Sequence, residues 1–274
     1  MVNKLLKHEV KYYIRTLFIY EIVLFTLAFF TRILMFFETD SIVYKLAQGS
    51  SFILFGFAVF ACSLMATVIS VFRFYKNLFT SEGYLTFALP VSSNQHLFAK
   101  LLSASVYNII VFISCIAAFL ITISGDLFNE LVKASIYLLK FIGQQLPDVP
   151  LTLHIVLYII EICVSMLVST VLSLLLYYVC IAIGQTAKKN RILLAVAIYF
   201  GYMMLTEIFS TIISITMSIT MNLPLFQKIS TYIINHPFAT LHISFCSTIV
   251  ITTIMCVVFY VITNVIMKRK LNLE

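Results

Sequence analysis

Ionisable side chains interrupt four long apolar stretches of the sequence, at Glu21, Arg32, Glu161 and Glu207. A charged group inside hydrocarbon is costly, so each one marks a pathway, a proton or cation site, or a paired contact. At a rise of about 1.5 Å per residue, Arg32 and Glu207 lie about 24 and about 22 Å from the ends of their stretches that carry lysine and arginine. Because these depths match, we predict that the two side chains pair, within one subunit or across a dimer. Such a pair would serve packing or the gating of a substrate.

Serines recur at every fourth position of two apolar stretches. Spacing of four places each set on one face of a helix. Small polar faces favour close helix–helix packing, and a polar strip lining a transport path would show the same pattern, so both interpretations stay open. The two sets are Ser165, Ser169 and Ser173, which follow Glu161, and Ser210, Ser214 and Ser218.

Sequence motifs for catalysis are missing. The chain has no G-x-x-x-x-G-K-[ST], no H-E-x-x-H, no G-x-S-x-G and no Cys/His cluster. The 6 cysteines all lie inside apolar stretches, where we expect small packing residues rather than disulfides or zinc ligands. The 5 histidines are scattered, and we expect structural roles for them. We therefore predict no catalytic residue, metal site or cofactor on this chain and no enzyme activity of its own.

The composition requires a non-aqueous surrounding. Of the 274 residues, 62% are hydrophobic and 11% charged, and the mean hydropathy is +1.06. A soluble domain carries about 25% charged residues. This deficit excludes a soluble enzyme, a disordered chain and a small disulfide-rich secreted domain, and it indicates a polytopic membrane protein.

Six stretches are long enough for a helix to cross about 30 Å of hydrocarbon. All 5 prolines lie outside them, which favours unbroken helices. The predicted fold class is therefore an all-α integral membrane protein with six transmembrane helices. The predicted spans are Thr16–Phe37, Ser51–Phe72, Leu101–Ser124, Leu151–Gly184, Leu193–Met221 and Leu241–Met267.

Positive charge is sorted between the two sides of these spans. Thirteen of the 18 lysines and arginines fall in the N-terminus, the 73–100 loop, the 185–192 loop and the C-terminus, and four fall on the opposite side. Cytoplasmic segments carry the excess of lysine and arginine, so we predict that both termini are cytoplasmic. The net charge of +7 is then a topology signal, and we expect no nucleic-acid partner.

Three connecting segments have a character of their own. Residues 3–15 alternate lysines with apolar side chains at helical spacing, which predicts an amphipathic helix on the inner interface. Residues 125–150 predict a second interfacial helix on the outer surface. Residues 222–240, between Pro224 and Pro237, are too short to cross and predict a re-entrant outer segment before the last helix. We expect 1–274 to form a single transmembrane domain.

The loop at residues 72–100 carries the most specific signal. Gly83 and Pro90 enclose a short apolar stretch, and Ser92 with Gln95 fits a capping box that starts the next helix. This predicts a short, partly apolar lever on the cytoplasmic face, attached directly to two membrane helices. An exposed apolar patch of this kind favours a protein partner.

Within this loop, Phe74-Tyr75-Lys76-Asn77-Leu78-Phe79, Glu82-Gly83-Tyr84-Leu85 and Leu89-Pro90-Val91 resemble the permease subunits of bacterial ABC-2-type exporters. In that family this loop carries a coupling helix that docks on a separate ATPase, and the resemblance implies the same for residues 82–91. Glu82 would then meet a basic residue of the ATPase. The implied docking residues are Glu82, Gly83, Tyr84, Leu85, Phe87, Leu89, Pro90 and Val91.

The resemblance also implies partners and a location. ATP and Mg²⁺ would be bound by two ATPase subunits, and a second permease copy or a paralogous permease would complete the complex in the bacterial plasma membrane. A Phe-rich interior suits a peptide or a hydrophobic or amphipathic substrate. Alternative hypotheses are a secondary transporter or channel that uses Glu161 and Glu207, an intramembrane enzyme, and a peptide-binding immunity or regulatory subunit.

Overall fold

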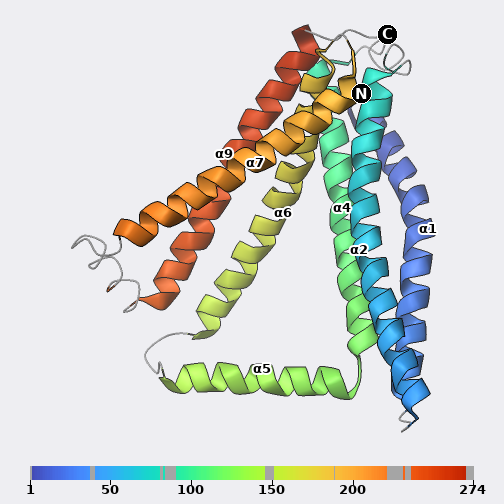
Figure 1. The fold of residues 1–274 in the computed structure, drawn as a ribbon, viewed down its shortest axis with the longest axis vertical. Coiled ribbons are helices and arrows are strands. Elements are labelled where there is room, and N and C mark those ends of the chain that lie inside the picture. The colour runs from blue at the N-terminus through green and yellow to red at the C-terminus, as the bar shows by residue number, and fades with distance from the viewer. Residues whose placement is uncertain are drawn as a thin grey trace. The chain divides into compact units, whose positions relative to one another are not determined.

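The computed structural model of the protein describes residues 2–37, 41–80, 83, 91–145, 151–187, 189–220, 231 and 236–269. This part of the chain is helical throughout and contains no strand (Figure 1). Six of its helices are long and apolar enough to cross a membrane, which confirms an all-α, multi-pass membrane protein. The helices are α1 (Val2–Phe36), α2 (Ile42–Phe79), α4 (Ser93–Ile123), α5 (Asp126–Gln145), α6 (Leu151–Gly184), α7 (Arg191–Thr220) and α9 (Pro237–Arg269).

The first helix differs from the prediction at its N-terminal end. We expected an amphipathic helix at 3–15 that turns into a separate span, but α1 is one unbroken helix of 35 residues. It contains no glycine or proline, so nothing in its backbone favours a break. Its first turns also pack within the protein, because Glu9 and Tyr13 are buried.

The contacts divide the chain into two compact units. Unit 1 comprises Met1–Arg73 and Gln95–Leu151, and unit 2 comprises Phe74–Asn94 and Thr152–Glu274. Unit 1 holds α1, α5 and most of α2 and α4, whereas unit 2 holds α6, α7 and α9. The expected single permease domain over 1–274 stays a prediction.

In unit 1, helices α1, α2 and α4 lie side by side (Figure 1). Alanines with no or almost no exposed surface allow this close approach, among them Ala28, Ala66 and Ala104. A hydrogen bond also joins α4 to α2, because the Asn108 side-chain amide donates to the Ser70 hydroxyl at 2.9 Å. Small residues and a satisfied hydrogen bond are the expected means of holding helices together where no hydrophobic driving force acts between them.

The helix predicted within 125–150 is present as α5, and its interfacial position stays a prediction. It begins after Gly125, whose φ of 105° is a conformation that L side chains rarely adopt. The Arg32 guanidinium lies against this glycine, because a Cβ built on Gly125 would come within 2.6 Å of an Arg32 nitrogen. Helix α5 exposes apolar side chains such as Tyr137 and Leu138, at 71% and 58%. The predicted re-entrant segment lies largely outside the described residues, and α9 begins at Pro237, a favoured first helical residue.

In unit 2, the end of α6 approaches the start of α7 closely at Gly184. A Cβ built on Gly184 would lie 2.7 Å from the Ala195 Cβ and 2.7 Å from the Arg191 carbonyl oxygen. Real Cβ atoms are not found at such distances from backbone. Glycine is therefore required by packing at this position.

We expect opposite effects from the same substitution at two helical glycines. Gly184→Ala should destabilise the protein by about 1–3 kcal/mol, because the added methyl overpacks the α6–α7 contact. Gly201→Ala in α7 meets nothing within 4 Å, so it should be neutral or stabilising by up to about 1 kcal/mol. Midpoints of thermal unfolding of the two detergent-solubilised variants test this. Equal midpoints would show that the close approach does not exist.

Candidate functional site

The predicted docking loop is only partly described. Of its eight residues the structure describes Gly83, whose amide donates to the Thr80 carbonyl oxygen at 2.8 Å, and Val91. The other six lie outside the described residues: Glu82, Tyr84, Leu85, Phe87, Leu89 and Pro90. The flanking helices, by contrast, are described and show how the loop is held.

These helices reach further into the loop than predicted. Helix α2 continues to Phe79, beyond the predicted end of its span at Phe72, and α4 begins at Ser93, as the capping box predicts, before the predicted start of its span at Leu101. The start at Ser93 places Ser92 and Gln95 where a capping box requires them. The segment between the two helices is therefore shorter than 72–100, and the whole resemblance-bearing run 74–79 is helical.

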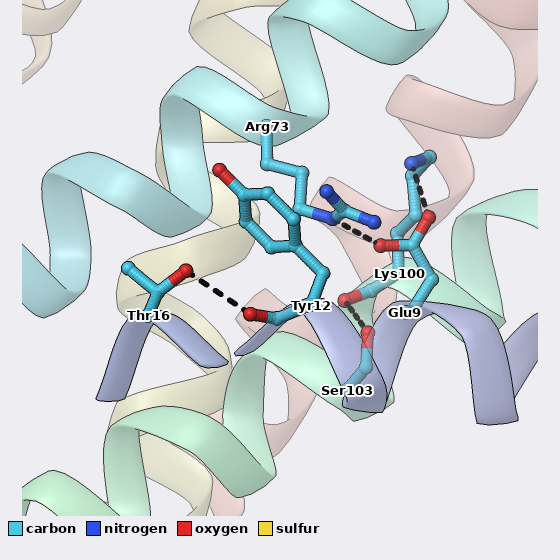
Figure 2. Close-up of polar contacts among 6 residues, drawn as sticks. All are labelled: Glu9, Tyr12, Thr16, Arg73, Lys100 and Ser103. Carbon is cyan, nitrogen blue, oxygen red and sulfur yellow. Dashed lines mark hydrogen bonds and ion pairs between the residues drawn. The ribbon is translucent and has the colours of Figure 1, made fainter. Parts of the chain in front are cut away.

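A buried ion cluster joins the loop-side ends of three helices in unit 1. The carboxylate of Glu9 in α1 lies between Arg73 of α2 and Lys100 of α4 (Figure 2). The Arg73 Nε donates to Glu9 Oε2, and the Lys100 Nζ donates to Glu9 Oε1 at 2.9 Å. The side chains of Glu9 and Lys100 are only 6% and 4% exposed. One carboxylate thus holds both helices that lead into and out of the loop.

Aromatic rings complete the surroundings of this ion cluster. The Arg73 guanidinium lies 3.6 Å from the centroid of the Tyr12 ring, a distance suited to a cation–π interaction. Tyr13 stacks on Tyr107 with centroids 4.7 Å apart. The cluster carries two positive charges and one negative charge, and the face of Tyr12 offers the excess cation a second favourable contact. Burial strengthens each of these interactions relative to water.

The two ends of the loop segment make side-chain contacts within unit 2. The ring of Phe74 lies parallel to that of Tyr178 in α6, with centroids 3.7 Å apart, and both residues are almost completely buried. At the other end of the segment, the Tyr260 hydroxyl of α9 donates to the Asn94 side-chain oxygen. The segment Phe74–Asn94 is therefore fixed to α6 at its start and to α9 at its end.

Two of the four intramembrane charges have separate surroundings. Arg32 belongs to unit 1 and packs against Gly125, whereas Glu207 belongs to unit 2 and is exposed on α7, so their pairing stays a prediction. Glu21 is half-buried in α1, and its Oε2 has no hydrogen-bond partner within the described part of the chain.

Glu161 is the intramembrane charge with a clear partner. Its Oε1 lies 2.7 Å from Nδ1 of His242 in α9, and the Nε2 of that ring lies 2.9 Å from Nδ1 of His154. We expected scattered histidines with separate structural roles, and the structure instead brings these two together across 88 positions of sequence. The five-histidine pattern gave no signal for this, because the pairing depends on how α6 and α9 pack.

The predicted serine faces are placed on α6 and α7, but their role stays a prediction. The hydroxyls of Ser165 and Ser173 donate to carbonyl oxygens three residues earlier, at 2.8 and 2.9 Å. Such local bonds satisfy a hydroxyl in an apolar surrounding without a partner helix. The remaining serines of these faces are exposed on the surface of the described chain: Ser169, Ser210, Ser214 and Ser218.

The sequence patterns did not predict the ion cluster, because they identify Arg73 and Lys100 only as topology signals. A usable signal existed, since Glu9 is the one acidic residue among the lysines of segment 3–15. All six cysteines are free thiols; Cys115 and Cys180 are buried, Cys163 and Cys246 are exposed, and the packing role stays a prediction.

No family model, curated protein or solved structure matches the chain.

Proposed function

We propose that this chain is the membrane-spanning permease subunit of an ATP-driven exporter and that separate ATPase subunits dock on its 82–91 loop. The observation that carries the proposal is the way in which the flanks of this loop are anchored. In unit 1, Arg73 and Lys100 are bonded to a single carboxylate, and in unit 2 the segment between them is fixed through Phe74 and Asn94. An element that transmits force needs such rigid attachment, whereas a simple connector does not.

The anchored loop suits the work of a lever. Helix α2 passes without interruption from Arg73 to Phe74, so a displacement of the loop is carried into both sets of contacts. Packed helices shift as rigid bodies rather than deform continuously, and such shifts separate inward-open from outward-open states. Nucleotide binding to the ATPases would bias these two states by interacting differently with each.

Under this proposal, the lack of a P-loop motif in the sequence means that nucleotide is bound by other subunits. ATP and Mg²⁺ would be held by the partner subunits, and this chain would supply the path through the bacterial plasma membrane. Two ATPase subunits would require two permease chains, either two copies of this one or this one and a paralogue. The long apolar helices suit a peptide or another hydrophobic or amphipathic substrate.

Affinity purification of the tagged protein from its native membrane tests the docking. We expect a P-loop ATPase to co-purify with the unaltered chain. The double variant Tyr84→Asp, Leu89→Asp should reduce its recovery by about tenfold or more, which corresponds to a loss of at least about 1.4 kcal/mol of binding free energy. Both substitutions place a charge in the apolar part of the loop, where it opposes docking into an apolar groove.

A matched variant on α5 controls for general effects of the added charges. Tyr137→Asp with Leu138→Asp changes the same two residue types, which are exposed at 71% and 58%. It should leave the recovery of the ATPase unchanged. If the intact, unaltered protein recovers no ATPase from its own membrane, the exporter proposal is wrong.

A further inference from the structure

His154, His242 and Glu161 form a continuous line of hydrogen bonds between α6 and α9. The contact from His154 Nδ1 to His242 Nε2 is 2.9 Å, and that from His242 Nδ1 to Glu161 Oε1 is 2.7 Å. Both nitrogens of the His242 ring are therefore engaged by neighbours in a line. A metal site needs lone pairs that converge on one point, and no such group of three or more His, Cys, Asp or Glu residues occurs in the described part.

This line of hydrogen bonds leads from the ends of two helices into an apolar span. His154 and His242 lie in the first two turns of α6, which begins at Leu151, and of α9, which begins at Pro237. Glu161 lies about 15 Å further along α6 than Leu151. Its second oxygen, Oε2, is buried and has no hydrogen-bond partner in the described residues. The line thus ends on a carboxyl group that is otherwise poorly satisfied.

Aromatic side chains surround the middle of the line. The ring of Tyr158 stacks on His242 at 4.3 Å, and its hydroxyl donates to the Phe238 carbonyl oxygen at 3.1 Å, so that hydroxyl is engaged outside the line. Phe238 in turn stacks on His154 at 4.9 Å. Within the described residues, the titratable groups in contact with His242 are His154, Tyr158 and Glu161, all from α6. The side chains of His242 and Glu161 are only 19% and 16% exposed.

We propose that these three side chains form a proton-uptake site that carries one proton from the N-terminal ends of α6 and α9 to Glu161. With Glu161 ionised, His242 Nδ1 donates to the carboxylate and His154 Nδ1 donates to His242 Nε2. The Nε2 of His154 is then unprotonated and able to accept a proton.

Uptake of a proton reverses both hydrogen bonds in turn. A proton binds His154 Nε2, the Nδ1 proton of His154 passes to His242 Nε2, and the Nδ1 proton of His242 passes to Glu161 Oε1. One proton enters, both imidazoles end neutral, and the carboxylate becomes a carboxylic acid. The negative charge is thereby removed from the apolar span, where a charge is costly. The distribution of lysine and arginine in the sequence predicts that His154, where the proton enters, lies on the outer side of the membrane.

Infrared difference spectroscopy of the full-length protein in lipid nanodiscs tests the site. When the pH is lowered from about 8 to about 5, a C=O stretching band of a protonated carboxyl should appear. Glu161→Gln should abolish this band, which assigns it. His242→Phe keeps the stacked ring but removes both nitrogens, so the band should be lost although Glu161 is present. His154→Phe removes the entry nitrogen and should have the same effect.

Control variants separate a relay from a purely structural link between α6 and α9. Glu207→Gln and His8→Gln change exposed groups outside the line and should retain the Glu161 band. Gel filtration and thermal unfolding show which histidine variant is folded, and either folded variant suffices. A band that persists in the folded histidine variants, or a wild-type protein without a titrating carboxyl band, overturns the relay. This outcome is independent of whether an ATPase binds the loop.

Discussion

Glu9→Gln is expected to lower the free energy of unfolding by roughly 3–5 kcal/mol, because it removes the one negative charge from a buried cluster. The glutamine keeps the size of the side chain and one acceptor oxygen. Arg73 and Lys100, with side chains 11% and 4% exposed, then face a neutral amide in place of the carboxylate that bonds both of them. Equilibrium unfolding in mixed detergent micelles measures the change.

Two further variants determine whether charge is the cause. Glu130→Gln makes the same substitution at an exposed position of α5 and should change the unfolding free energy by less than about 0.5 kcal/mol. Adding Arg73→Met and Lys100→Met to Glu9→Gln removes all three charges and should recover much of the lost stability, since apolar replacements of buried ion clusters are well tolerated. If Glu9→Gln and Glu130→Gln behave alike, the cluster does not hold the three helices together.

Phe74→Ala is expected to destabilise the protein by roughly 3–5 kcal/mol, as is typical when a buried aromatic ring is truncated. Phe74 is 1% exposed and Tyr178 is 0% exposed, so the ring leaves a cavity that water cannot fill favourably. The stacking with Tyr178 is lost as well. The same unfolding measurement reports the effect. Phe72→Ala, two residues earlier in α2, removes a ring that is 58% exposed and should have little effect.

A milder change at the same position addresses the proposed lever. Phe74→Leu keeps an apolar side chain and should preserve the fold, but it removes the parallel contact with Tyr178. Under the proposed function, we expect less substrate transported per ATP hydrolysed, because the loop is held less firmly to α6. An unchanged ratio in a folded Phe74→Leu protein would show that this contact does not transmit force.

The spans were predictable from sequence because of the solvent around them. In hydrocarbon, every backbone amide and carbonyl must be bonded within its own segment, so a long apolar stretch without proline has to be helical. The ends of the helices were predicted less well, as α2 shows. Lysine and arginine lower the hydropathy of a terminal turn without ending the helix, because their long side chains extend toward polar surroundings while the backbone stays helical.

The continuity of α1 is a second feature that could not be predicted from the sequence. The amphipathic pattern of 3–15 correctly predicted a helix, but it carried no information on whether a bend follows. In the structure the polar side chain of Glu9 is occupied by Arg73 and Lys100 inside unit 1. A polar position on a helix therefore indicates water, an interface or a buried partner equally well, and only packing distinguishes them.

By itself, the sequence determined the class of the protein, its six membrane helices, the helix in the connection after the third span and the start of α4 after Ser92. These features depend on local composition and on residues a few positions apart. The tertiary structure alone determined that Glu9 meets partners 64 and 91 positions away and that His154 meets His242 across 88 positions. Such contacts depend on which helix faces meet, and helical periodicity fixes the face of a residue without fixing its neighbour.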